Sequence, residues 1–320
     1  MKNRLLLLVV LLVSSIAVEA QVTDAEKTLR EQKADTVSGW KNGGVLSVNL
    51  AQTSLTNWAA GGQNSFAVNG LFSVFANYQG ESSSWTNSLD VGYGIIKQNG
   101  VDVRKTDDKF DFLSKYGKKA FDGVYYAALL NLKSQLSVGN NYPDPANPDL
   151  KNKISNLLAP GYLIGALGLD YKPNAYFSAF VSPVTAKFTF VMDDDLSTAG
   201  AFGVSPGEKM NSELGAYIRI IYTKNDFKSD LLKHVSFTTK ADFFSNYLQN
   251  PQNIVVNWET LIAMKINKFI SASINTQMIY DDKIKVPFDR NGNDIIESGE
   301  VVGSKIQFKE ILGIGFSYNF

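Results

Sequence analysis

The sharpest pattern of chemistry-bearing residues lies near the end of the chain, where residues 289–300 read DRNGNDIIESGE. Oxygen-bearing side chains stand at positions 1, 3, 5, 9 and 12 of this stretch, which is the spacing of an EF-hand calcium loop. Asp294 occupies position 6, where such loops carry glycine, and aspartate enters the left-handed conformation only at some energetic cost. The flanks alternate like strands, so we predict a calcium loop without helices, with a merely polar outer loop as the alternative. The predicted ligands are Asp289, Asn291, Asn293, the carbonyl of Ile295, Glu297 and Glu300.

Charged residues also recur on the polar faces of several segments in which apolar and polar residues alternate. Acids and bases are mixed in this set, and because isolated buried charges are costly, these groups must pair or stay hydrated. If the segments form a narrow barrel, we predict a lumen closed by ion pairs, with a polar pathway for a small solute as the alternative. The candidate lumen-lining residues are Asp90, Asp111, Lys133, Glu213, Arg219, Lys240, Asp242, Glu259 and Lys265.

The remaining chemistry argues against an enzyme. His234 is the single histidine and ends the connection 223–233, a poor place for a base that must assist a nucleophile at an outer rim. We interpret it as a surface histidine, and an outer-membrane hydrolase is the less favoured alternative. The acidic run at residues 193–195 is interpreted as a solvated rim. The chain has no phosphate-binding loop, no paired catalytic carboxylates and no thiolate zinc cluster.

The elements that would position these groups are strands with one apolar and one polar face. In residues 305–320 one parity is apolar or aromatic except for Glu310, and the other is small or polar except for Ile311. A period of two predicts a strand. Its length exceeds the ~5–6 residues usual in soluble proteins and suits a tilted membrane crossing of about 9–11 residues. The edge strand of a soluble sandwich is the alternative.

The same alternation recurs about twelve times, an even number as in single-chain bacterial barrels. Pro183 falls inside one segment and predicts a bulge or a break, because proline cannot donate a ladder hydrogen bond. The segment at 109–116 is the weakest, and a misreading there would change an even count by about two. We therefore predict an all-β fold, a transmembrane antiparallel up-and-down β-barrel. The expected strands are 43–51, 66–78, 85–95, 109–116, 126–136, 163–171, 176–191, 214–222, 235–243, 254–264, 270–280 and 305–320.

Connections between these segments alternate in length. With the N-terminus in the periplasm, every even-numbered gap must be a periplasmic turn, and most of these gaps are short, such as 79–82. The odd-numbered gaps include the long ones at 139–160 and 192–207. Short periplasmic turns and long outer loops are typical of outer-membrane barrels. The gap 223–233 is long for its side and the gap 249–252 is short, so the match is incomplete.

The first residues are predicted to be a targeting segment. A basic start, an apolar run at 5–13 and a small-residue pattern at 18–20 indicate a signal peptide over residues 1–20, with a retained anchor as the alternative. Residues 21–42 are expected to form a periplasmic N-terminal arm. Residues 43–320 are expected to form the barrel.

Composition narrows the classes of function. The chain has no cysteine, and its 31 Lys+Arg balance its 31 Asp+Glu, so neither a thiolate metal site nor a basic surface for nucleic acid is expected. After the signal region no segment holds 18 consecutive apolar residues, so helical spans are not expected. A mean hydropathy of −0.09 fits a barrel whose polar lumen dilutes its apolar exterior.

Short motifs are spread over nearly the whole mature chain. They are TNWAAGG at 56–62, DK at 108–109, SKYG at 114–117, YY at 125–126, KSQ at 133–135, LAP at 158–160, DYKP at 170–173, NWE at 257–259 and YDD at 280–282. With these motifs the chain resembles an uncharacterised outer-membrane β-barrel family, a domain of unknown function found mainly in Bacteroidetes. The resemblance implies location and fold and brings no assigned activity.

We therefore expect a bacterial outer-membrane protein with a structural or accessory role in the cell envelope, a lumen plugged by charged pairs, and no enzymatic activity. The alternative is a narrow channel for small polar or amphipathic solutes. The expected partners are outer-membrane lipids, the barrel-assembly machinery during insertion and other envelope proteins, with no nucleic acid. No cofactor is expected to be required, apart from calcium in the loop before the last strand.

Overall fold

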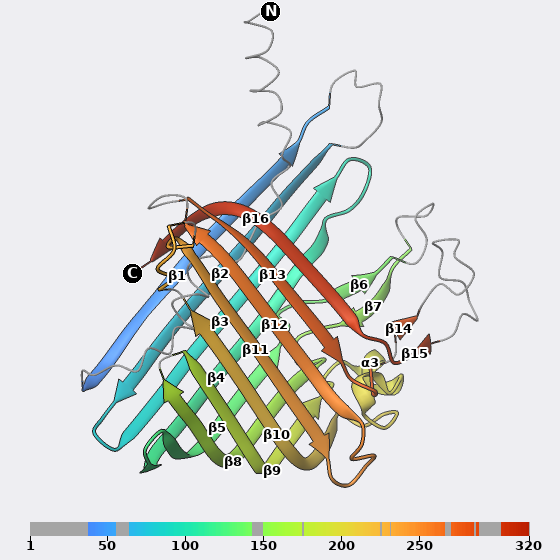
Figure 1. The fold of residues 1–320 in the computed structure, drawn as a ribbon. Coiled ribbons are helices and arrows are strands. Elements are labelled where there is room, and N and C mark those ends of the chain that lie inside the picture. The colour runs from blue at the N-terminus through green and yellow to red at the C-terminus, as the bar shows by residue number, and fades with distance from the viewer. Residues whose placement is uncertain are drawn as a thin grey trace, which may run out of the picture.

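Twelve antiparallel strands close into one barrel in the computed structural model, so the predicted fold class and strand number are confirmed (Figure 1). The structure describes residues 38–55, 64–142, 150–174, 176–224, 226–230, 232–265, 270–284, 286–287 and 302–319. Each barrel strand pairs with the barrel strands before and after it in the chain, and the first pairs with the last. The strands are β1 (Gly39–Thr53), β2 (Ser65–Gln79), β3 (Ser83–Gln98), β4 (Arg104–Phe121), β5 (Val124–Ser134), β8 (Gly161–Asn174), β9 (Phe177–Phe190), β10 (Met210–Lys224), β11 (Val235–Asn246), β12 (Ile254–Lys265), β13 (Ile270–Tyr280) and β16 (Gln307–Asn319).

Alternation along each strand places polar residues inside the barrel and apolar residues outside. In β11 every second residue is buried, from Ser236 through Lys240 to Asn246. On the outer face of β1, Leu46 and Leu50 are exposed. A barrel in water would bury its apolar face instead, so this polarity suits an apolar surrounding medium.

Most connections at one end of the barrel are short turns, and longer connections prevail at the other end (Figure 1). The connection between β10 and β11 is an exception, because it is long although it lies at the end with the short turns. One short turn is Asp122 and Gly123, and Gly123 has a φ of 73°, a left-handed conformation that glycine adopts without strain. The expected alternation of short and long connections is thus present. No helix in the described part of the chain is long and apolar enough to cross a membrane. The longer connections carry β6 (Gly139–Asn141), β7 (Asn152–Ser155), α3 (Asp194–Thr198), η1 (Ala201–Gly203), β14 (Val286–Pro287) and β15 (Val302–Gly303).

Most strands are longer than expected, and β1 and β4 show the difference clearly. β1 begins at Gly39 rather than Gly43. β4, expected as a weak segment from Lys109, begins at Arg104 and is the longest strand at 18 residues. Its first residues are nearly all charged, so they show no alternation, and pairing with β3 extends the strand through them. Residues 1–37, which hold the predicted signal peptide and most of the predicted arm, lie outside the described residues.

Pro183 lies at a β-bulge in β9, one of the two outcomes predicted from its position. The register of β9 shifts against β8 between Leu167 and Leu169, and it shifts against β10 at the matching height. The Ser182 hydroxyl donates a hydrogen bond to the Leu167 carbonyl over 2.8 Å. The hydroxyl thereby gives the Leu167 carbonyl a hydrogen-bond donor at a point where the ladder is interrupted.

Gly168 of β8 faces this bulge, and a Cβ there would lie 2.0 Å from the Val181 carbonyl oxygen. We expect Gly168→Ala to push β8 and β9 apart and to destabilise the barrel by about 1–3 kcal/mol, the usual range for an overpacked site. The measurement is the midpoint of urea unfolding, followed by heat-modifiable gel mobility. Gly165→Ala is the control, because a Cβ at Gly165 would meet nothing within 4 Å. Equal midpoints for both variants would contradict the prediction.

Candidate functional site

A buried charged cluster lies in the middle of the barrel lumen. Arg219 of β10 and Asp242 of β11 are register partners, and Arg219 Nε lies 3.6 Å from Asp242 Oδ1. The Tyr217 hydroxyl donates to Asp242 Oδ1 over 2.7 Å, and Arg219 Nη1 donates to the Tyr217 oxygen over 3.4 Å. Tyr217 and Arg219 are two residues apart on one strand, so both point to the same side of the sheet. All three side chains are buried inside the barrel.

Lys133 links this cluster to the opposite side of the lumen. Its ammonium lies 3.7 Å from Asp242 and 3.8 Å from Asp111, close enough to attract both carboxylates but beyond hydrogen-bonding distance of either. Asn131, two residues earlier on β5, donates to Asp111 over 2.6 Å. Lys133 therefore connects two carboxylates that come from different parts of the barrel wall.

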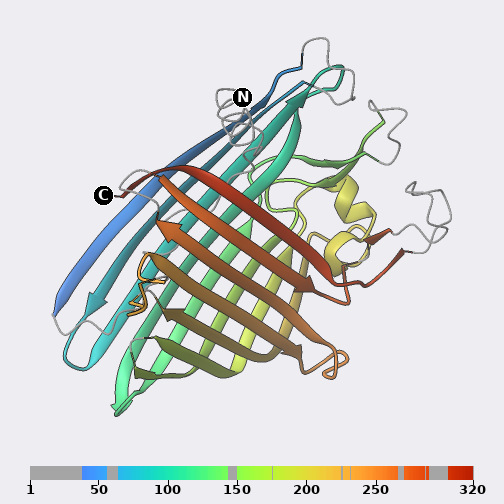
Figure 2. The same cartoon turned by 45° about the horizontal axis from the view of Figure 1, so that its top comes forward.

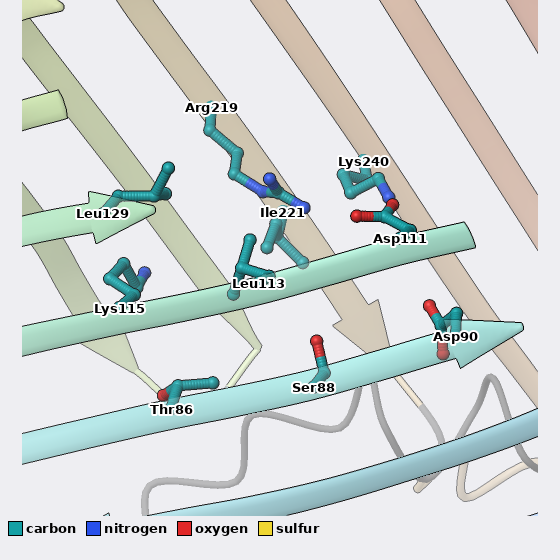
Figure 3. Close-up of a pocket in the computed structure, with 10 residues that line it drawn as sticks. All are labelled: Thr86, Ser88, Asp90, Asp111, Leu113, Lys115, Leu129, Arg219, Ile221 and Lys240. Atoms are coloured by element: carbon teal, nitrogen blue, oxygen red, sulfur yellow. The ribbon is translucent and has the colours of Figure 1, made fainter. Parts of the chain in front are cut away.

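A further ion pair completes a layer of charge. Lys240 of β11 and Glu259 of β12 are register partners, with Nζ 3.1 Å from Oε2. Lys240 also lies beside Asp111 (Figure 3). The resulting set, which we call the mid-lumen charge layer, comprises Asp111, Lys133, Arg219, Lys240, Asp242 and Glu259. Three of these six residues are acidic and three are basic, so their formal charges cancel.

Cavities lie on both sides of the mid-lumen charge layer. The larger, which we call the outer vestibule, has a volume of about 400 Å³ and reaches the long connections at Phe202 and Ile284. The smaller has a volume of about 60 Å³, and Thr86 and Lys115 line its far side (Figure 3). Asp111 lines both cavities, so the charge layer borders each of them.

The outer vestibule has a partly apolar wall and a charged floor. The wall includes Tyr162, Ile164, Phe244 and Val255, and the floor is the mid-lumen charge layer. Gln307 of β16 also lines the vestibule, and its Nε2 is buried without a hydrogen-bond partner. A small molecule with an apolar body and an oxygen acceptor would complete this arrangement.

One ion-pair cluster near the short turns was not expected from the sequence. Asp170 accepts a hydrogen bond from Ser178 over 2.8 Å, and it lies 2.7 Å from Lys115 and 3.2 Å from Lys172. Lys115 shares the inward parity of Asp111 and lies within the expected strand 109–116, so the same alternation could have found it. Nothing in the sequence pairs Asp170 with Lys115, because their strands are joined through β5.

A second cluster surrounds Glu213 at the vestibule. Of this cluster the sequence predicted Glu213 alone as lumen-lining, and it lies 3.3 Å from Lys187 and 2.5 Å from Lys283. Lys187 lies a further 3.7 Å from Asp281. Lys187 follows the bulge at Pro183, which changes the parity of β9, and the other two partners lie in a connection. Alternation counted along one strand therefore misses these partners.

The other predicted site residues are distributed as follows. Asp90 of β3 accepts a hydrogen bond from Ser73 and lines the smaller cavity. His234 is exposed before β11, in agreement with a surface histidine. The side chain of Lys265 and the whole predicted calcium loop at 289–300 lie outside the described residues. Among the described residues no group of three or more His, Cys, Asp or Glu is arranged to hold a metal ion.

The acidic run at 193–195 is only partly the solvated rim that was expected. Asp195 is 82% exposed, but the side chain of Asp193 is only 7% exposed. Asp193 caps the N-terminus of α3, where it accepts hydrogen bonds from the backbone N–H groups of Asp195 and Leu196. Lys153 of β7 lies 2.8 Å from Asp193. The prediction was wrong for Asp193 because a five-residue helix follows it.

Comparisons with known proteins found one family and several similar solved structures. A family described as "Protein of unknown function (DUF3078)" matches residues 50–142, less than half of the chain. The crystal structure of the COG4313 outer membrane channel from Pseudomonas putida F1 is similar over 91% of this chain and 98% of its own, at 10% identity and a TM-score of 0.40. A structure from work on the in-meso crystallization of membrane proteins covers 87% and 84%, at 9% identity and a TM-score of 0.29. No curated protein matches.

The family match fits the expected resemblance to a family without an assigned activity. The expected occurrence in Bacteroidetes stays a prediction.

Asp242 balances Arg219 in the lumen, so removing this carboxylate leaves a buried cation short of a partner. We expect Asp242→Ala to lower the free energy of unfolding by about 3–5 kcal/mol, and Arg219→Met with Asp242→Leu to recover most of the loss. Urea titration measures both changes. Asp122→Ala is the control, because Asp122 is fully exposed where it pairs with Lys119 at a turn, and no measurable change is expected there. An equal loss in Asp122→Ala would contradict the prediction.

Hydrogen bonds from Lys153 and Asn156 lower the pKa of Asp193 from 3.8 to about 2. A carboxylate with a lowered pKa stabilises the fold at neutral pH, and this stabilisation is lost as the pH falls through the folded-state pKa. We therefore expect residues 191–209 to resist pepsin at about pH 4 and to be cleaved faster near pH 2. Asp193→Ala should be cleaved readily at both values, whereas Asp194→Ala should behave like the unsubstituted protein. Cleavage of the unsubstituted protein at one rate across this range would refute the prediction.

Proposed function

We propose that the protein spans the bacterial outer membrane as a closed β-barrel. The apolar exterior supports this location: Leu46, Leu130 and Leu167 are exposed on three different strands, and their counterparts recur around the barrel. A continuous apolar surface of this kind is unfavourable in water, but it matches the hydrocarbon core of a bilayer.

Aromatic rings near the short turns support the same proposal. The Trp40 ring lies 5.5 Å from the ring of Tyr78 and 5.8 Å from that of Trp85, measured between centroids. Trp40 and Trp85 are both exposed on the outer face. Amphipathic rings gather at headgroup depth in membrane barrels, so this cluster fits the girdle at the periplasmic side.

The role that the geometry supports best is that of a structural or accessory envelope protein whose lumen is closed at mid-depth. The mid-lumen charge layer carries this proposal, because its acids and bases are mutually paired and electrically balanced. An ion that entered the lumen would have to separate these pairs in a confined space. Each charge that loses its partner there costs on the order of several kcal/mol. The exposed His234 offers no catalytic arrangement, so we propose no enzymatic activity.

A narrow channel for small amphipathic solutes is the second candidate. The outer vestibule favours it, because its apolar wall lies beside a charged floor and the Gln307 Nε2 has no hydrogen-bond partner. This combination is unusual for a purely structural plug. In this alternative the solute would enter from the side of the long connections.

The expected partners remain proposals of the same kind. Outer-membrane lipids would contact the apolar exterior, and the barrel-assembly machinery would act during insertion. Contacts with other envelope proteins stay a prediction. Calcium binding at 289–300 also stays a prediction, since that loop lies outside the described residues.

Planar-bilayer recording tests the closed lumen. We expect the unsubstituted protein to give no ion conductance, and a variant with Asp111, Lys133, Arg219 and Asp242 all replaced by Ser to give discrete channel openings. The four substitutions remove two acids and two bases, so the lumen keeps its net charge while losing the groups that fill it.

Lys119→Ser with Asp122→Ser is the matched control, because this exposed pair lies at a turn outside the charge layer. It should remain silent. Steady conductance from the unsubstituted protein would overturn the closed lumen and favour the channel. If gel mobility shows that the quadruple variant is folded and it still gives no conductance, the mid-lumen charge layer is not what closes the lumen.

A further inference from the structure

The seam between β1 and β16 is the weakest part of the barrel wall. Between described residues its ladder comprises four residue pairs and ends at Val48 and Phe316, although β1 continues to Thr53 and β16 begins at Gln307. In contrast, β2 pairs with β1 over its whole length, and β13 pairs with β16 up to Gln307. Beyond Val48 the two strands diverge (Figures 1 and 2). Fewer ladder hydrogen bonds hold this seam than hold the neighbouring strand pairs, so separating it costs less free energy.

The outer vestibule borders the part of β16 that lies beyond this ladder. Gln307 and Lys309, on the part of β16 that β1 does not pair, both line the vestibule. Within the described part of the chain, no residue of β1, β2 or β3 contributes to the lining. The vestibule is thus bounded on one side by β4 and on the other by β16, with the unpaired seam between them in the ring.

An ion pair crosses this boundary. Lys309 of β16 lies 3.1 Å from Asp107 of β4, although three strands separate them around the ring. The two side chains are 46% and 29% exposed, so solvent screens the attraction and the bridge is weak. The Lys309–Asp107 bridge thus lies between the vestibule and the seam, and little free energy is needed to break it.

We propose that the outer vestibule opens sideways through the β1–β16 seam and passes small aromatic or amphipathic molecules into the bilayer, with Asp107 and Lys309 as the latch. The inference rests on the proposed membrane barrel with a closed lumen and goes beyond it, because a barrel blocked along its axis keeps this lateral route. The apolar vestibule wall suits the body of such a molecule, and Gln307 Nε2 can donate to an oxygen in its polar part.

The test uses N-phenyl-1-naphthylamine, a small aromatic amine that an intact outer membrane largely excludes and that fluoresces once it enters lipid. Bacteria producing the protein should take up this probe faster than bacteria with an empty vector. Lys309→Ala should accelerate uptake about two- to fivefold, the effect of losing one exposed ion pair. Asp107→Ala should act alike, and the double variant should add little to either.

A disulfide lock gives the decisive comparison, because the chain has no cysteine of its own. Continuing the register beyond Val48 and Phe316 brings residue 51 opposite residue 313, so Ala51→Cys with Gly313→Cys would close the seam. Oxidation should return uptake to the vector level, and reduction should restore it. Ser47→Cys with Ser317→Cys is the matched control within the existing ladder, and its oxidation should change nothing.

Unchanged uptake in the oxidised lock, or equal uptake with and without the protein, would overturn the lateral route while the protein still fractionates with the outer membrane. If the lock does not oxidise, the latch variants decide, and unchanged uptake in Lys309→Ala overturns the proposal. Recovery in the soluble periplasmic fraction would instead overturn the membrane barrel itself. Exclusion of a large hydrophilic dye throughout shows that general membrane damage is not the cause.

Discussion

The closed backbone hydrogen-bond ladder is the constraint on which the other features depend. Twelve strands can face an apolar medium only if nearly every N–H and C=O pairs with a neighbouring strand, since hydrocarbon offers no replacement partner. Once the wall supplies those bonds, its outer face is free to be apolar, as at Leu46 and Leu50. The same alternation then directs the polar parity inward, so the charged lumen follows from closure and period two together.

An inward polar parity creates the electrostatic problem that the mid-lumen charge layer resolves. Charges confined between low-dielectric walls are costly unless paired, and each residue of the layer has an opposite charge within about 4 Å. Pairs such as Arg219–Asp242 and Lys240–Glu259 come from neighbouring strands in register. Lys133 instead reaches from β5 towards β11, so the layer spans the lumen and does not merely coat its wall.

The sequence predicted the barrel well because strand formation depends on local alternation. It found the inward charges of β10, β11 and β12 for the same reason, since their parity is uninterrupted. It could not find the partners Lys187 and Asp281, because a bulge changes the parity of β9 and a connection carries Asp281. The length of β4 was also hidden, because its charged first residues become strand only through pairing with β3. Pairing between distant segments is a tertiary property that periodicity does not encode.

The ladder is interrupted at two places, the bulge at Pro183 and the β1–β16 seam, and different interactions hold the backbone at each. At Pro183 the Ser182 hydroxyl donates to the Leu167 carbonyl, and the Tyr247 hydroxyl donates to the Pro183 carbonyl over 3.0 Å, so side chains satisfy the irregular backbone and fix the bulge. At the β1–β16 seam the described bridge is an exposed pair, Asp107 and Lys309, that solvent can replace at little cost. An interruption held by neutral side-chain hydrogen bonds is rigid, whereas one held by a screened ion pair exchanges readily. The wall is therefore expected to yield at the seam before it yields at the bulge.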